Sequence, residues 1–270
     1  DTAFLLGAVP KRYKDLDLPE LDTYFAAARG YQGDHGDVKA FAMKKWFNTN
    51  YHYMVPEIDD DTKLSLSGNK PFDLYNEALE NGVKTKSVII GAYTFLKLAR
   101  YTGSKNANDF VDAAIAAYKD ILAKFSGLGA EWVQIDEPCL VMDMDADDKA
   151  LFDKIYKEVL SAKGSVKVLL QTYFGDVRDC YSDICALDFD GIGIDFVEGK
   201  KSLELVKSNG FPKDKVLFAG VVNGKNIWKN HYANTVKLVD EINGMGIQEA
   251  FCICKGKAFR TCRTQDNTFS

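Results

Sequence analysis

From residue 70 onward, short apolar runs alternate with segments whose apolar residues are spaced three and four positions apart. The second spacing is that of an amphipathic helix, and it is clearest at 109–126, over about five turns. Further helices are predicted at 71–81, 147–162, 200–209 and 228–243. The apolar runs lie at 87–93, 131–136, 166–174, 190–197, 215–222 and 249–254. Because these runs are apolar throughout, they are typical of parallel strands that helices cover on both faces.

This alternation predicts an α/β chain built around a parallel sheet. No GxGxxG motif follows the first run, which disfavours a dinucleotide-binding sheet. A TIM-type (β/α) barrel fits better, although a closed barrel needs eight strands. We therefore expect an incomplete barrel with about six of the eight βα units. No linker rich in Pro, Gly or Ser divides the chain, which indicates one domain.

The first 70 residues do not follow the alternation. Residues 18–30 predict a short helix, 31–37 a flexible polar loop, and 38–47 a second helix. Two extended strands are predicted at 51–58 and 63–67. The expected architecture is thus a barrel preceded by a helical and β-hairpin insertion.

Composition excludes several classes of protein. The 270 residues are 46% hydrophobic and 27% charged, which is typical of a globular chain with a substantial core. Lys+Arg 34 minus Asp+Glu 39 leaves a net charge of −5, which argues against nucleic acid as a partner. No apolar run reaches the ~20 residues of a membrane-spanning helix. The six cysteines are sparse for this length, which favours reduced thiols and a cytoplasmic location.

Candidate chemistry lies at the carboxyl ends of the predicted strands, where the functional groups of a parallel barrel collect. Asp136 and Glu137 follow the second strand and are candidates for an acid/base pair. Strand-end carboxylates also cap helices or bind loop amides, and the spacing alone favours that structural role. The other strand-end positions are Tyr93, Thr94, Pro138, 173–176, 195–198, 223–226, Cys252 and Cys254.

Metal ligands are few. The three histidines, His35, His52 and His231, are too scattered to form a metal-binding triad. Cys252 and Cys254 would point to one face of a strand, where two thiolates could hold zinc with two further ligands. Cysteines in an apolar strand are more often part of the core, so no metal is expected in this chain.

Five segments in order resemble one family. They are KKWFNTNYHYMVPE, EWVQIDEPCLVMD, LQTYFGDVRD, GIDFVEG and AGVVNGKNIWKN. Together they resemble the N-terminal barrel of cobalamin-independent methionine synthase, from Asp1 to about Ile247. The resemblance implies a barrel fragment at 1–248, which begins after the family's first two strands. It also implies an aberrant tail at 249–270, because that segment does not resemble the family.

The resemblance implies a function as well. Family enzymes transfer a methyl group from 5-methyltetrahydropteroyltri-L-glutamate to L-homocysteine, which forms methionine. Their zinc is bound through His, Cys, Glu and Cys in a C-terminal barrel, which would be the missing partner of this domain. The N-terminal barrel helps to hold the folate polyglutamate tail, and no catalytic residue is expected in it.

Lys45 is the site residue that the resemblance implies. It precedes the Trp-Phe pair of KKWF and falls on a folate-binding position of the family. Its ammonium would lie near the glutamate carboxylates as a point charge. We also expect Trp46 and Phe47 to be buried anchors beside it. Without the resemblance, Lys45 would be interpreted as a solvated lysine at a helix end.

Two alternatives remain open at this point. One is a self-sufficient α/β-barrel lyase or zinc enzyme that uses Asp136, Glu137, Asp195 and the late cysteines. The other is a non-catalytic interaction protein descended from the barrel.

Overall fold

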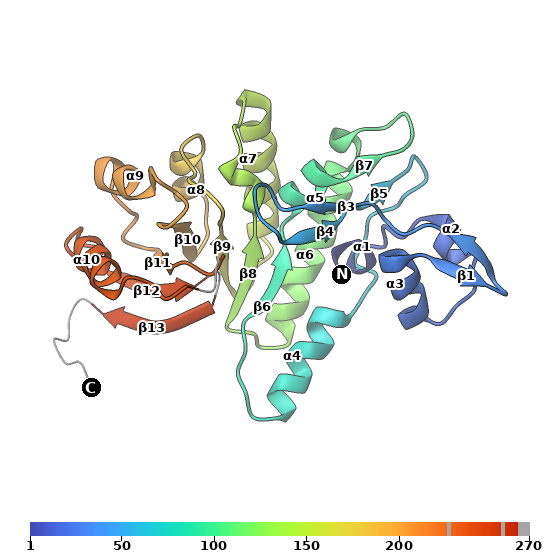
Figure 1. Cartoon of the computed structure of the whole chain (residues 1–270), viewed down its shortest axis with the longest axis horizontal. Coiled ribbons are helices and arrows are strands. Elements are labelled where there is room, and N and C mark those ends of the chain that lie inside the picture. The colour runs from blue at the N-terminus through green and yellow to red at the C-terminus, as the bar shows by residue number, and fades with distance from the viewer. Residues whose placement is uncertain (226–227, 255–256, 264–270) are drawn as a thin grey trace.

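The computed structural model describes residues 1–225, 228–254 and 257–263, and from residue 251 onward it describes the backbone alone. Within these residues one large sheet has the strand order β13-β12-β11-β10-β9-β8-β6 (Figure 1). Neighbouring strands are parallel except for β12 and β13, which are antiparallel. The strands are β6 (Ser87–Ile90), β8 (Trp132–Asp136), β9 (Lys167–Gln171), β10 (Gly191–Asp195), β11 (Val216–Val222), β12 (Glu249–Cys254) and β13 (Lys257–Arg263).

All six apolar runs therefore contain strands, and helices connect them, but the first strand ends at Ile90 and the predicted strand end at 92–93 begins a helix. The helices are α4 (Lys70–Glu80), α5 (Ala92–Leu98), α6 (Val111–Gly127), α7 (Ala146–Leu160), α8 (Tyr181–Ala186), α9 (Ser202–Asn209) and α10 (Tyr232–Asn243). Local signals explain several boundaries. Pro71 lies in the first turn of α4, and the Asp145 carboxylate accepts the backbone N–H of Asp148 at the start of α7. Strong periodicity and end signals make the longer helices predictable from sequence, whereas the short helix α5 was not predicted.

An incomplete barrel was expected, and the described sheet is open and does not confirm a barrel. Among the described residues the sheet has two ends, β6 and β13, and no pairing joins them. Figure 1 shows the N-terminal hairpins and helices beside β6, whereas β12 and β13 lie at the opposite end of the sheet. The observed architecture is an open, mainly parallel α/β sheet. Pairing between its ends is a long-range property that strand patterns do not encode.

The N-terminal 70 residues form short helices and two hairpins. The helices are α1 (Thr2–Leu5), α2 (Lys11–Lys14) and α3 (Glu20–Arg29). The first hairpin pairs β1 (Tyr31–Gly33) with β2 (Gly36–Val38), and the second pairs β3 (Met43–Lys45) with β4 (His52–Met54). A short parallel pair joins β5 (Glu57–Ile58) to β7 (Arg100–Tyr101).

Three predictions in this region were wrong. Residues 31–37 are a hairpin rather than a loop, and 38–47 contain β3 rather than a helix. Ala, Met and Lys favour a helix locally, but the pairing of β3 with β4 overrides that weak preference. Residues 63–67 form no strand, although the N–H groups of Ser65 and Ser67 donate to the carbonyls of Leu6 and Leu5, respectively.

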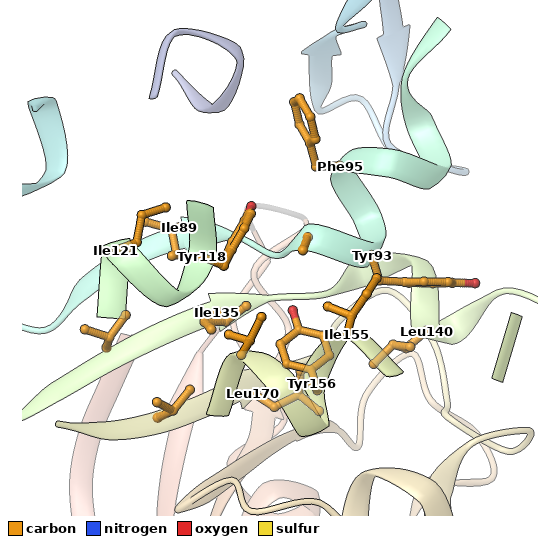
Figure 2. Packing of buried hydrophobic residues seen from close by; sticks show 14 of the residues in the cluster. Ile89, Tyr93, Phe95, Tyr118, Ile121, Ile135, Leu140, Ile155, Tyr156 and Leu170 are labelled. Atoms are coloured by element: carbon orange, nitrogen blue, oxygen red, sulfur yellow. The ribbon is translucent and has the colours of Figure 1, made fainter. Parts of the chain in front are cut away.

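The core lies between the sheet and helices α5, α6 and α7. Figure 2 shows side chains from the sheet meeting side chains from these helices. The Tyr118 hydroxyl on α6 donates to the Ile90 carbonyl at the end of β6, so the helix is tied to the strand as well as packed on it. Labelled residues in this cluster are Ile89, Tyr93, Phe95, Tyr118, Ile121, Ile135, Leu140, Ile155, Tyr156 and Leu170. In the part of the chain that the structure describes, no helix is long and apolar enough to cross a membrane.

Candidate functional site

Lys45 is the last residue of β3, and its register partner is His52 of β4. Its side chain is exposed, and Nζ donates to Oδ1 of Asn50 at 3.2 Å. The residue therefore lies on a strand, not at a helix end. Trp46 and Phe47 were expected to be buried, but both are only half-buried. A hairpin of two three-residue strands is too small to enclose two large aromatic rings.

The β3–β4 hairpin crosses near the carboxyl ends of β6 and β8 (Figure 1). Trp46 packs on Tyr53 across the hairpin, with ring centroids 4.5 Å apart. Both rings line a cavity of about 270 Å³ that also includes Ile90 from β6 and Thr94 from α5. The hairpin thus places Trp46 and Tyr53 over the edge of the sheet where candidate chemistry was expected.

Glu137 does not form an acid/base pair with Asp136. Its side chain is fully buried and accepts the backbone N–H groups of Tyr93 and Thr94 at 3.0 and 2.7 Å. The Tyr156 hydroxyl also donates to it. Burial raises the pKa of Glu137 to about 7, and the hydrogen bonds oppose that shift. Glu137 therefore holds the first turn of α5 against β8, which is the structural alternative that the spacing left open.

Asp136 has a separate set of partners. Its carboxylate accepts Nε2 of Gln134 at 2.6 Å and the hydroxyl of Tyr173 at 3.0 Å. Burial raises the pKa of Asp136 to about 6, while these hydrogen bonds and the charge of Lys86 lower it. Burial in turn lowers the pKa of Lys86, whose Nζ lies 5.2 Å from the centroid of the Phe218 ring.

Three buried polar atoms around Asp136 lack hydrogen-bond partners among the described residues. Within the described residues, Nζ of Lys86 and Oε1 of Gln134 and Gln171 are buried without a hydrogen-bond partner. Lys86 and Asp136 also line an open cavity of about 950 Å³ that runs along β6 and α4. A buried polar atom without a hydrogen-bond partner destabilises the folded state, so the hydrogen-bonding capacity of the groups around Asp136 is only partly used.

Asp195, at the end of β10, also serves the backbone. Its carboxylate accepts the N–H groups of Phe174, Val197 and Glu198 at 3.0, 2.8 and 2.9 Å. The three carboxylates that the alternative lyase or zinc enzyme would use are thus held by different partners.

Metal-binding geometry is lacking in the part of the chain whose side chains are described. No three His, Cys, Asp or Glu residues gather there in a way that could hold a metal ion. Of the cysteines, Cys139, Cys180 and Cys185 are free thiols. The side chains of Cys252, Cys254 and Cys262, on which the zinc alternative depended, lie outside the described residues.

Comparison with known proteins decides the family. Residues 1–246 match the family model described as cobalamin-independent synthase, N-terminal domain. The chain belongs to this family. The chain is 55% identical over 242 residues to 5-methyltetrahydropteroyltriglutamate–homocysteine methyltransferase of Streptococcus thermophilus, and the match covers 90% of this chain and 32% of the relative. A relative of the same name from Lactococcus lactis subsp. cremoris is 52% identical over 245 residues, which is 91% of this chain and 32% of the relative.

The chain therefore spans about a third of the length of these curated relatives. A solved structure is similar in fold: a B12-independent methionine synthase from Shewanella sp. W3-18-1 in complex with selenomethionine. The TM-score is 0.57 at 11% sequence identity, and the match covers 76% of this chain and 64% of that one. At that identity the similarity concerns the fold alone.

Sequence reasoning missed the contacts of the hairpin tip. Residues 173–176 and 223–226 were identified as strand-end positions, and the tip lies on both loops. The ring of Tyr51 stacks on Phe174, and its hydroxyl donates to the Gly224 carbonyl at 3.0 Å. The signal in the sequence was the density of aromatic residues in WFNTNYHY and in TYF, but nothing local indicated that the two segments meet.

Proposed function

We propose that this chain is the N-terminal part of a methyltransferase that transfers a methyl group from 5-methyltetrahydropteroyltri-L-glutamate to L-homocysteine in the cytoplasm. The observation that carries the proposal is 55% identity across 90% of the chain to a relative of that name. The domain, at 1–248, contributes a scaffold and binds the folate polyglutamate tail. The methyl transfer and its zinc ion belong to a second barrel outside these residues, which is the partner of this one.

The finer fold that we propose is a TIM-type barrel of which this chain contributes six of eight βα units. Six consecutive parallel strands from β6 to β12 support it. The cavity along β6 supports it as well, because further strands at this edge would fill it. Such strands would also offer hydrogen-bond partners to the buried Nζ of Lys86, which has none among the described residues. The described sheet is then the larger part of a closed one.

Lys45 is the proposed contact for the glutamate tail. Its ammonium is exposed, and its one hydrogen bond from Nζ, to Asn50, is easily exchanged for a carboxylate. A lysine binds such a group as a point charge, without the two-pronged geometry of arginine. An exposed ion pair contributes ~0.2–1 kcal/mol, so Lys45 adds to the affinity for the tail without dominating it.

The test uses a full-length enzyme that contains this sequence. Lys45→Ala should raise the KM for the triglutamate folate by about two- to fivefold, which corresponds to the energy of one exposed pair. The kcat should not change, because the tail is bound equally in the ground state and the transition state. The monoglutamate should be less affected, and added salt should weaken the effect.

Lys44→Ala is the matched control. Lys44 is also exposed, but it faces Tyr53 in the register and so lies on the other side of the hairpin from Lys45. Equal effects of the two substitutions would mean that only the general positive potential matters. A defect of Lys45→Ala confined to kcat would assign Lys45 a different role.

A further inference from the structure

The β3–β4 hairpin is attached to the rest of the molecule at its tip. Phe174, in the loop after β9, has its ring centroid 6.1 Å from that of Phe47 and 6.3 Å from that of Tyr51. The Tyr51 hydroxyl donates to the Gly224 carbonyl after β11 at 3.0 Å. Nζ of Lys225 lies 3.4 Å from Oδ1 of Asn48. The tip is therefore held by loops more than a hundred residues away in sequence.

The backbone on both sides of this contact has unusual geometry. Phe47 and Phe174 have positive φ angles of 47° and 76°, a region that residues other than glycine rarely adopt. Such conformations cost ~1–3 kcal/mol each and persist where the surroundings impose them. Asp195 imposes one of them, because its carboxylate accepts the Phe174 N–H at 3.0 Å. The two strained residues face each other across the contact.

The hairpin needs this attachment. Its strands have three residues each, and a two-stranded hairpin of that size is marginally stable in water. Lys45 ends one of these strands, and its partner Asn50 lies within the tip. Contacts that fix the tip therefore also fix the backbone from which the lysine side chain projects.

We propose that Phe174 and Tyr51 are positioning residues for Lys45, and that the clamp they form on the hairpin tip orients its ammonium toward the carboxylates of the folate tail. This inference rests on the proposed function. The clamp touches no substrate. It acts by ordering the hairpin before binding, so that less conformational entropy is lost when the tail is bound. Asp195 supports the clamp through the Phe174 backbone.

The first experiment tests the clamp in the 270-residue chain itself. Tyr51→Phe removes only the hydroxyl that donates to Gly224. Hydrogen exchange of the backbone amides at 43–54 should become severalfold faster, while exchange in β8 and β9 stays unchanged. Tyr31→Phe is the control, because it removes a hydroxyl from the other hairpin, β1–β2. Unchanged exchange at 43–54 in Tyr51→Phe would overturn the clamp.

The second experiment tests positioning in the full-length enzyme. Tyr51→Phe and Phe174→Ala should each raise the KM for the triglutamate folate about two- to fivefold, with kcat and the monoglutamate KM little changed. In the Lys45→Ala background, Tyr51→Phe should have no further effect, because the group that it positions is gone. An undiminished effect in that background would overturn the inference, since the hydroxyl would then act by another route.

The two proposals fail in different ways. If Lys45→Ala leaves the KM unchanged while Tyr51→Phe loosens the hairpin, the clamp exists but the role of Lys45 in tail binding is wrong. If Lys45→Ala raises the KM while Tyr51→Phe changes neither exchange nor KM, the proposed function survives and the positioning role is refuted.

Discussion

The side chain of Glu137 is fully buried, and its carboxyl group accepts hydrogen bonds from two backbone N–H groups at the start of α5. Space around it is tight, since a Cβ added to Gly91 would lie 2.1 Å from Oε1 of Glu137. The carboxylate, the glycine and the Tyr156 hydroxyl therefore form one packed unit. At the residue scale, a group that resembled a catalytic acid on strand position alone is a structural one.

At pH 5, Glu137→Gln should lower the free energy of unfolding by about 1–3 kcal/mol, because the amide NH₂ has no lone pair with which to accept a donor that a carboxyl oxygen accepted from. The loss should depend on pH. The folded-state pKa of about 7 lies above the ordinary 4.5, so the native state binds the proton more tightly between these values. The stability that Glu137 contributes is therefore full below pH 4.5 and declines as pH rises to 7.

Urea unfolding of both proteins at pH 5 and pH 8 measures this dependence. The difference between wild type and Glu137→Gln should shrink by about 2 kcal/mol from the lower to the higher pH. Subtracting the two free energies of unfolding at each pH cancels the contribution of the other carboxylates, which both proteins share. A difference that stays constant, or grows toward pH 8, would show that burial does not raise the pKa of this carboxyl.

At the scale of elements, strand β6 forms an exposed edge of the large sheet. Within the described residues it pairs with β8 alone, and Val88 at its middle is 50% exposed. Leu74 on α4 is also exposed and lines the same open cavity. An unpaired strand with apolar side chains is a template for pairing with another chain.

We therefore expect the isolated 270-residue chain to self-associate as its concentration rises, and Val88→Lys to reduce that association. A lysine on an edge strand opposes pairing by charge and desolvation. Sedimentation velocity over a concentration series provides the measurement. Val83→Lys is the matched control, because Val83 is 53% exposed but lies in the turn after α4. Equal reductions by both substitutions would indicate general charge repulsion instead of edge pairing.

At the scale of the whole molecule, the chain spans about a third of its curated relatives. The carboxylates at its strand ends are bound to backbone, amide and hydroxyl groups, and no described cluster could hold zinc. We predict that the purified 270 residues form no methionine from homocysteine and methyltetrahydropteroyltriglutamate. The assay should be run with added zinc beside a full-length relative. Zinc-dependent methionine formation by the 270 residues alone would contradict the prediction.

The sequence by itself determined the family and, from residue 70 onward, the order of the strands and of the longer helices. Strands covered on both faces must be apolar throughout, and helices with one buried face must repeat every three to four residues, so both leave a local pattern. That is why β8 and α6 were predicted with nearly correct ends. It also determined which strand-end loops carry polar side chains, including the positions of Asp136, Glu137 and Asp195.

Only the tertiary structure decided how those groups are used. The carboxylates of Asp136 and Glu137 bind different partners because different neighbouring elements offer them hydrogen-bond donors. The open edge at β6 depends on which strands are paired. Lys45 lies on a strand because β4 pairs with β3, although its local sequence favours a helix. Its surroundings depend on contacts such as that of Tyr51 with Phe174 and Gly224. Such contacts join distant segments, and their energy depends on geometry that no local pattern of residues specifies.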